Sequence, residues 1–421
     1  MHITESLTDE QIITAFEQFV SSGKVAMYHR MGLAVVPGER SGVRLTSRDG
    51  RLSLINCRSS GGVFNLGHRP QAIIDAVIEA MATLDIGDHL LMSEPRARLA
   101  ARLADLLPGD LRYTTFGVSG GEAVDFALKV ARGFTGRQGV ISVQGGYHGH
   151  TGLALAAGDP VFRDPFGPAI PGFRQVPFGD LDALRAAMSR DVAAVIVETI
   201  PATAGILIPP DGYLAGIRTL CDEFGALFIA DEVQAGLGRT GRLWAIDEWG
   251  VIPDMMVLGK GLSAAIYPIT ATCYTPAVDR WLAEVNPFIH ISTFGGSDIG
   301  CVAALTMFDI ITAPGFMEHV RAMGDRLTGG LRDLAEQHPA LVYEVRGRGL
   351  MIGVEMTDAR LGQMLTVLLA QNGVLALFAN NRPTTMIVMP PLIISADEVD
   401  EVIAAFARSF AILAQGVAGG G

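Results

Sequence analysis

The chain has 421 residues, of which 49% are hydrophobic and 18% charged, and its formal net charge is −12. This length exceeds what one compact core usually holds, so two domains, or one large domain with a smaller annex, are expected. The negative charge argues against a surface that binds nucleic acid or an anionic membrane. An anionic ligand must therefore be held by a local site.

The first twenty residues predict a short amphipathic helix and not a secretory signal, because they lack a basic segment and are acidic early on. No apolar run reaches the ~18–20 residues that a membrane-spanning helix needs, and Val192–Val197 stops at Glu198. The scattered cysteines form no CxxC pair, so neither a disulfide framework nor a metal site is expected and a cytoplasmic location fits best. They are Cys57, Cys221, Cys273 and Cys301.

Residues 43–55 predict a strand-turn-strand unit with Asp49-Gly50 as the turn. From about residue 100, helical periods alternate with short apolar runs, which predicts a largely parallel sheet with helices on both faces. The predicted strands are Gly139–Val143, Ala193–Glu198, Leu227–Asp231 and Met255–Leu258, and the predicted helices are Leu99–Leu107, Gly121–Arg132 and Asp211–Phe224.

The pattern changes near residue 310. A long amphipathic helix is predicted at Phe316–Glu336, and strands within Ala340–Glu355 and Thr385–Met389 flank a predicted helix at Arg360–Asn372. We expect residues 1–60 and 311–421 to form a smaller domain beside a large domain at 61–310. Residues 416–421 are expected to be a loose tail.

The first candidate site is at residues 118–132, where Ser119, Gly120 and Gly121 precede a predicted helix and Glu122 falls in its first turn. Free backbone N–H groups and the helix dipole at such a start can hold a phosphate. An ordinary N-cap serine, with glycines for the turn, explains the same residues. This motif by itself leaves both interpretations open.

The second candidate site is Leu227–Gly241, an apolar strand that ends in Asp231 and Glu232. Open α/β sheets bind ligands at this edge. An aspartate there can pair with a protonated ring nitrogen of a cofactor that draws electrons from its substrate. The alternatives are a metal ligand or a helix N-cap.

The third candidate is Lys260, which follows a predicted strand and lies between Gly259 and Gly261. Most lysines lie on the surface. The neighbours of Lys260 are apolar on both sides, so a buried ammonium would be costly unless its pKa falls. A lowered pKa is what a lysine needs in order to form a Schiff base, although a surface lysine remains the alternative.

Three further stretches give weaker signals. A Thr-Phe-Gly-Gly turn at residues 293–296 is predicted to start a helix and could donate hydrogen bonds to a phosphate. Gly145–Thr151 could place Tyr147 against the face of a ring, and its histidines match no metal-ligand spacing. Val345–Leu350 holds Arg346 among glycines, where an arginine can bind a carboxylate or form a surface pair.

Taken together and in this order, these segments resemble class III aminotransferases, the ornithine/ω-amino-acid group of fold-type I enzymes that use pyridoxal-5′-phosphate (PLP). The resemblance runs from Asn65–Pro70 to Met389–Ser395, and ADEVQAGLGRTG followed by a GKGL lysine and STFGG is a specific set. It implies an α/β fold of PLP fold type I, with a mostly parallel seven-stranded sheet between helices and a smaller α+β domain from both chain ends.

The resemblance also implies roles for individual residues. Lys260 is expected to hold PLP as a Schiff base and to move the substrate proton, and Asp231 to pair with the pyridine nitrogen. Thr293 is expected to reach the phosphate of the neighbouring subunit, which implies a homodimer or dimer of dimers with a shared active site. Arg346 is expected to hold a substrate carboxylate. The other implied cofactor-binding residues are Ser119, Gly120 and Gly121 at the phosphate, Tyr147 and Val233 at the ring faces, Gln234 at the ring hydroxyl, and His148 and Glu198.

Three departures from the family pattern are informative. Gly121 replaces the threonine of the usual Ser-Gly-Thr-Glu and removes a hydroxyl donor. Glu198 is followed by Thr-Ile-Pro-Ala in place of proline and a Gln-Gly-like pair, and Lys260 is followed by Leu-Ser-Ala-Ala-Ile-Tyr in place of a glycine-rich segment. These positions leave the substrate and the reaction type open, whereas Lys260, Asp231 and Thr293 are intact and predict cofactor binding.

The main hypothesis is amino-group transfer from an amino acid or amine donor to a keto acid or aldehyde acceptor through Lys260. The runner-up keeps the cofactor but ends in racemisation or epimerisation, decarboxylation, or elimination with C–C bond formation. A Rossmann-type NAD enzyme or a non-catalytic binding protein is the third hypothesis. It predicts a GxGxxG turn after an early strand, and the lack of such a turn and of a GxxxxGK[ST] loop argues against it. Arg346 allows a carboxylate-bearing substrate without requiring one, because its partner could be Glu198 or Glu232.

Overall fold

The computed structural model describes residues 6–418. Its largest sheet has seven strands in the spatial order β4-β10-β9-β8-β7-β5-β6. Strand β10 runs antiparallel to both of its neighbours, and the remaining pairs are parallel. The prediction of a mostly parallel seven-stranded sheet is therefore confirmed. In chain order the strands are β4 Tyr113–Gly117, β5 Gly139–Val143, β6 Phe173–Val176, β7 Val192–Glu198, β8 Leu227–Asp231, β9 Met255–Leu258 and β10 Thr270–Tyr274.

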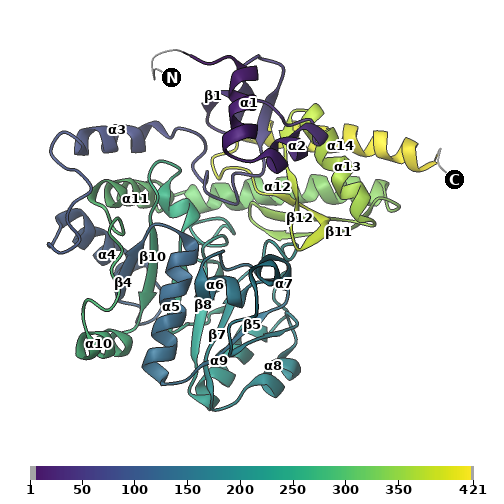
Figure 1. Cartoon of the computed structure of the whole chain (residues 1–421). Helices are drawn as coiled ribbons and strands as arrows, with labels where there is room; N and C mark the ends of the chain where they lie inside the picture. Colours follow the sequence, from purple (N-terminus) through teal and green to yellow (C-terminus); the bar gives the residue numbers. More distant parts are fainter. Residues whose placement is uncertain (1–5, 419–421) are drawn as a thin grey trace.

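Helices cover both faces of this sheet because successive side chains of a strand point to opposite faces. In β7, Ile196 packs in the same core cluster as α5 (Gly120–Thr135), whereas Val195 packs in the cluster that includes α9 (Tyr213–Phe224). Figure 1 shows α5 running alongside the strands of the sheet. The sheet is thus buried on both sides, which explains why its strands read as continuous apolar runs in the sequence.

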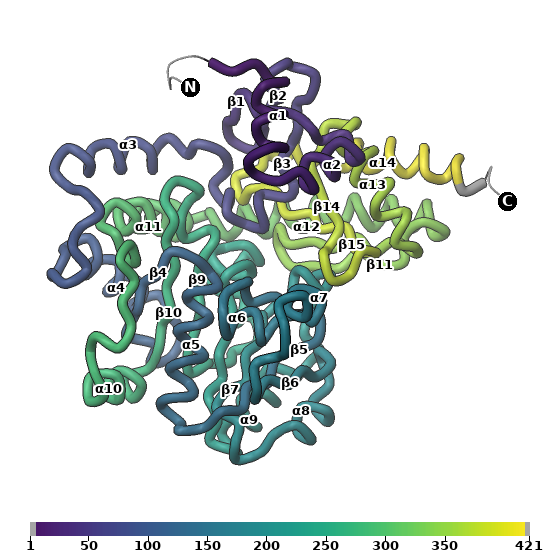
Figure 2. Tube along the Cα trace, viewed as in Figure 1, coloured from purple at the N-terminus to yellow at the C-terminus, as the bar shows by residue number. Residues whose placement is uncertain are grey.

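Segments from the two chain ends form a second, smaller unit. Strand β13 (Val374–Leu375) pairs in parallel with β3 (Ser53–Asn56), and Ile55 shares a hydrophobic core with Leu327 and Phe406. Figure 2 shows the N-terminal strands, in purple, beside the C-terminal segments in green and yellow. The expected α+β unit from both ends is confirmed. The remaining strands of its two sheets are β1 Pro37–Ser41 and β2 Arg44–Ser47 in one, and β11 Val342–Arg348, β12 Met351–Met356, β14 Leu377–Ala379 and β15 Arg382–Val388 in the other.

Two predicted helix starts were wrong. The helix expected from Leu99 already begins at Glu94, because a serine cap and a proline in the first turn precede the apolar residues that set the prediction. The turn at Thr293 does not start a helix directly. That helix begins at Asp298, where the hydroxyl of Ser297 caps it.

The C-terminal helix α14 (Ala396–Ala418) continues into the expected loose tail, so residues 416–418 are helical and 419–421 lie outside the described residues.

Among residues 6–418, no single helix is long and apolar enough to cross a membrane. Helices α11 and α12 meet those two criteria only as a pair that is bent by 71°. The other helices are α1 Asp9–Phe19, α2 Ser22–Arg30, α3 Gln71–Ala80, α4 Glu94–Leu106, α6 Gly152–Ala157, α7 Pro160–Arg163, η1 Asp164–Phe166, α8 Leu181–Ala187, η2 Ala245–Trp249, η3 Lys260–Ser263, α10 Pro276–Val285, α11 Asp298–Ile311, α12 Phe316–Gln337 and α13 Ala359–Gln371.

Candidate active site

Three neighbouring strands of the large sheet end at the same edge beside polar side chains. Strand β7 ends at Glu198 and β8 at Asp231, and these two residues are paired in the parallel register. Strand β9 ends at Leu258, just before Lys260. The exposed fractions of Glu198 and Asp231 are only 5% and 4%, and carboxylates are seldom buried in this way without partners.

Asp231 is held from two sides. Its Oδ2 lies 2.7 Å from Nδ1 of His148, and its Oδ1 accepts a hydrogen bond of 3.1 Å from the backbone N–H of Val233. Burial favours the neutral form of His148, but the hydrogen bond and charge of Asp231, with the charge of Glu198, raise the pKa of His148 overall. A protonated His148 donates a hydrogen bond to Asp231.

Lys260 opens the 3₁₀ helix η3 with a φ of +46°, a left-handed conformation that is uncommon for a residue with a Cβ. Its Nζ donates a hydrogen bond of 2.6 Å to Oε1 of Gln234. Burial lowers the pKa of Lys260, Glu198 and Asp231 oppose that shift, and the positive charge of Arg58 adds to it. A lower pKa leaves more of the amine neutral, and the neutral amine is the nucleophile.

Glu198 orders the loop that follows β5. Its Oε1 accepts a hydrogen bond of 2.8 Å from the backbone N–H of Tyr147. Burial raises the pKa of Glu198 to about 7, against the opposing charge of His148. Burial and the charges of Glu198 and Asp231 also raise the pKa of the Tyr147 phenol. The phenol of Tyr147 is therefore neutral, and the residue is held at the edge of the sheet where β7 ends.

The N-terminus of α5 lies at the same place. Ser119 is its N-cap, and Oγ accepts a hydrogen bond of 3.2 Å from the backbone N–H of Glu122, so the N-cap interpretation is confirmed. The N–H groups of Gly120 and Gly121 come first in the helix and have no intrahelical partner. They are available to an anion, so capping and anion binding do not exclude each other.

A cavity of about 340 Å³ is lined by all of the predicted cofactor-binding residues except Thr293. Thr293 is exposed on the surface of the protomer. The cavity is also lined by Gly149, His150 and Thr151, which the sequence prediction did not select. These three lie in the glycine-rich loop that also carries Tyr147, but the composition of this loop does not show which of its residues face the cavity. A second cavity of about 370 Å³ shares Lys260 with the first and is lined largely by residues 263–270.

Arg346 is engaged by Glu355 of its own unit and by the segment that follows β7. Its Nη1 donates a hydrogen bond of 2.5 Å to Glu355, and its Nη2 donates one of 2.6 Å to the carbonyl of Gly205. The alternative that Glu198 or Glu232 could be the partner of Arg346 was therefore wrong. The antiparallel register of β11 and β12 brings Glu355 to the arginine, and that register is not readable from the sequence. The role of Arg346 in binding a substrate carboxylate stays a prediction.

Glu232 serves as a buried cap for η2. Its carboxylate accepts hydrogen bonds from the hydroxyl of Thr199 and from the backbone N–H groups of Ala245 and Ile246. Glu232 is not an N-cap residue itself, since Trp244 holds that position in η2, but it satisfies the first N–H groups of η2 from another segment, whereas Asp231 lines the cavity. Burial raises the pKa of Glu232 to about 7, although the three donors oppose that shift.

We expect the Glu232→Gln variant to show a weaker pH dependence of stability than the wild type. The native state holds the Glu232 proton more tightly than the unfolded chain, whose pKa is near 4.5. The contribution of Glu232 to the stability of the native state is therefore complete below pH 4.5 and is lost as the pH rises towards about 7. Urea unfolding midpoints between those values should fall less steeply for the variant, and parallel slopes would contradict the assignment.

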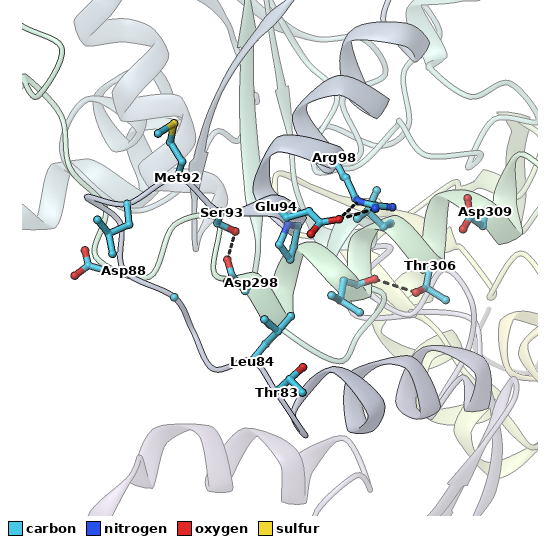
Figure 3. A pocket seen from close by; sticks show the side chains of 15 residues that line it. Thr83, Leu84, Asp88, Met92, Ser93, Glu94, Arg98, Asp298, Thr306 and Asp309 are labelled. Carbon is cyan, nitrogen blue, oxygen red and sulfur yellow. Dashed lines mark hydrogen bonds and ion pairs between the residues drawn. The ribbon is translucent and has the colours of Figure 1, made fainter.

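A third cavity, of about 690 Å³, lies between the segment 83–95 and α11. Figure 3 shows Ser93 bonded to Asp298 and Glu94 paired with Arg98 along this cavity. None of the predicted site residues lines it, and the neighbouring Met92 is fully exposed. It is thus distinct from the two cavities that share Lys260.

Comparison with known proteins shows which family the chain resembles. A family model described as aminotransferase class-III matches residues 26–410. An uncharacterized aminotransferase from Archaeoglobus fulgidus is 48% identical over 405 residues, which cover 96% of this chain and 95% of that protein. Among solved structures, an ornithine aminotransferase from Toxoplasma gondii with partial occupancy of PLP at its active site is 28% identical with a TM-score of 0.88, covering 97% and 96% of the two chains. An (S)-enantioselective omega-transaminase from Thermomicrobium roseum is 28% identical with a TM-score of 0.89, covering 97% and 99%.

The chain therefore belongs to the class III aminotransferases. It is a PLP-dependent enzyme of fold type I that transfers amino groups. The cavity of about 340 Å³ fits this cofactor by its chemistry. Free N–H groups at a helix start suit a phosphate, Lys260 offers an amine of lowered pKa to an aldehyde, and Asp231 offers a carboxylate to a pyridine nitrogen.

Removing the charge of Arg58 is expected to raise the pKa of Lys260, because that charge disfavours the ammonium form. The Arg58→Leu variant should then recombine with PLP more slowly near neutral pH, since less of the amine is neutral. The measurement is the rate at which the PLP-free protein recombines with PLP, followed as a function of pH. Arg51→Leu, which alters an exposed arginine paired with Asp49, should follow the wild-type profile; an unchanged profile in Arg58→Leu would contradict the prediction.

Proposed function

We propose that this enzyme transfers an amino group from an amino acid or amine donor to a keto acid or aldehyde acceptor, with Lys260 as the residue that binds PLP covalently and moves the substrate proton. When bound, PLP supplies the aldehyde that takes up the amino group and the pyridinium ring that withdraws electrons. The observation that carries the proposal is the amine of Lys260 in one cavity with Asp231, Glu198 and His148.

The other site residues would position the cofactor. Asp231, supported by His148, would hold the proton on the pyridine nitrogen, because an ionised carboxylate favours the charged ring. Gln234, which now accepts from Lys260, would turn to the ring hydroxyl once that amine is linked to the cofactor. The phosphate would lie at Ser119, Gly120 and Gly121, and the ring between Tyr147 and Val233.

A single-turnover experiment tests the proposal. The holoenzyme is mixed with one amino donor and no acceptor, and the visible absorbance of the cofactor is followed together with the keto product. Ornithine and chiral amines head the screen, because one solved relative is named an ornithine aminotransferase and another an (S)-enantioselective omega-transaminase. Amino-group transfer predicts one equivalent of keto product and lasting loss of the absorbance, restored by an acceptor. Racemisation, decarboxylation or elimination would instead leave the absorbance restored without an acceptor.

We further propose a homodimer or a dimer of dimers in which Thr293 reaches the phosphate of the partner. Three observations support it: Thr293 is exposed, Phe294 beside it is 54% exposed, and Leu91 and Met92, which line the cavity of about 690 Å³, are exposed as well. Exposed apolar groups gathered in this way are typical of subunit interfaces. Light scattering would measure the mass, and mixed oligomers of Lys260→Ala and Thr293→Ala chains would reveal sharing of the site.

The domain bounds 1–60, 61–310 and 311–421 and a cytoplasmic location also remain proposals. Support for the bounds comes from Ile55, which packs with the C-terminal core, and from the sheet that pairs β3 with β13. Support for a reducing compartment comes from the four cysteines, which are buried and unpaired. Limited proteolysis and localisation of a tagged chain would test them.

A further inference from the structure

The first turn of α5 and the loop before α6 touch beside the proposed phosphate position only because both carry glycine. A Cβ built on Gly121 would lie 2.7 Å from Oγ1 of Thr151, and one built on Gly149 would lie 2.5 Å from Cα of Gly121. Real Cβ atoms do not approach other atoms so closely. The hydroxyl of Thr151 therefore takes the space that a side chain at position 121 would fill.

That hydroxyl has no structural duty among the described residues. Thr151 stands at the N-cap of α6, where a threonine usually accepts a hydrogen bond from the first turn, but its side chain makes none. Asp125 replaces it there, since its Oδ1 accepts a hydrogen bond of 2.7 Å from the backbone N–H of Ala154. Thr151 lines the cavity that contains Lys260, so its hydroxyl is available to a ligand.

The same position carries the departure from the family pattern noted in the sequence. The threonine of the usual Ser-Gly-Thr-Glu is Gly121 here, and a phosphate dianion at the start of α5 would lose one O–H donor. Hydrogen bonds to an ionised acceptor are the stronger kind, so the loss would be appreciable. A hydroxyl that reaches the same space from another loop makes up for it.

We propose that Thr151 donates a hydrogen bond to the phosphate of PLP in place of the side chain that Gly121 lacks. The proposal rests on PLP binding in this cavity, as set out above. The donors around the phosphate are then the N–H groups of Gly120 and Gly121 and the hydroxyls of Ser119 and Thr151, supplied by two loops of the same protomer.

The test is the affinity of the full-length enzyme for two ligands, PLP and pyridoxal, which lacks the phosphate. Thr151→Val keeps the shape and removes the hydroxyl, and Thr151→Ser keeps the hydroxyl. Thr219→Val is the matched control, because Thr219 is exposed on α9 and bonds only to its own helix. Thermal unfolding of each PLP-free variant checks that the fold is kept.

We expect Thr151→Val to raise the dissociation constant of PLP about tenfold, the effect of one hydrogen bond to a charged group, and to leave that of pyridoxal unchanged. Thr151→Ser and Thr219→Val should bind both ligands as the wild type does. Wild-type PLP affinity in Thr151→Val, or an equal loss for PLP and pyridoxal, would overturn the inference. A wild-type enzyme that binds no PLP would instead overturn the cofactor site as a whole.

Discussion

Lys260→Ala is expected to lower kcat by at least about a thousandfold while leaving the fold intact. If Lys260 has the proposed role, the variant loses both the amine that binds PLP covalently and the group that moves the substrate proton. Positioned proton transfer alone contributes roughly 10²–10⁴-fold. The fold should persist because the Nζ of Lys260 makes one hydrogen bond, to Gln234. Single-turnover kinetics with a donor from the screen would measure the loss.

The small number of lysines allows a second, unambiguous measurement of which residue binds the cofactor. Besides Lys260 the chain has only Lys24 and Lys129, so borohydride reduction of the holoenzyme followed by peptide mass analysis can assign the linked residue directly. We expect the label on Lys260 in the wild type and none in Lys260→Ala. Lys24→Ala, an exposed change on α2, should keep both label and turnover. A label on Lys24 or Lys129 would refute the assignment.

The strands that carry the site could be predicted from the sequence because they are buried on both faces. Leu227–Asp231 and Met255–Leu258 are apolar throughout and end at residues whose chemistry marks the edge of the sheet. Strand β10 was missed because threonines interrupt its apolar character. Thr272 is nevertheless buried, since its hydroxyl donates to the carbonyl of Ala123 in α5, and such a partner is invisible in a hydrophobicity pattern.

The contacts within the site depended on distances along the chain that no local pattern encodes. His148 and Asp231 are 83 residues apart, and only the parallel order of β5, β7 and β8 brings them together. Glu198 and Glu232 were considered as possible partners of Arg346, whereas the hairpin register gives it Glu355. The residue types of the site were therefore predictable, and their pairing was set by the topology of the two sheets.

Asp231→Asn is expected to reduce kcat by roughly a hundred- to a thousandfold, as removal of one preorganised electrostatic group usually does. Asparagine can still accept a hydrogen bond from His148, so the geometry of the strand end should survive while the charge is lost. The pKa of His148 should fall, because the charge and hydrogen bond of Asp231 raise it. Histidine resonances followed against pH would show this shift independently of activity.

A matched control separates the effect of the lost charge on catalysis from an effect on stability. Asp254 lies at the opposite end of the sheet, where it pairs with Arg218 and accepts from the backbone of Phe228. Asp254→Asn should lower the unfolding midpoint but keep the kcat of the folded enzyme, since Asp254 does not line the cavity that contains Lys260. If Asp231→Asn also lost only stability, the carboxylate would be a structural partner of His148 alone. If kcat fell and the pKa of His148 fell with it, the charge at the end of β8 would be what keeps the ring an electron sink.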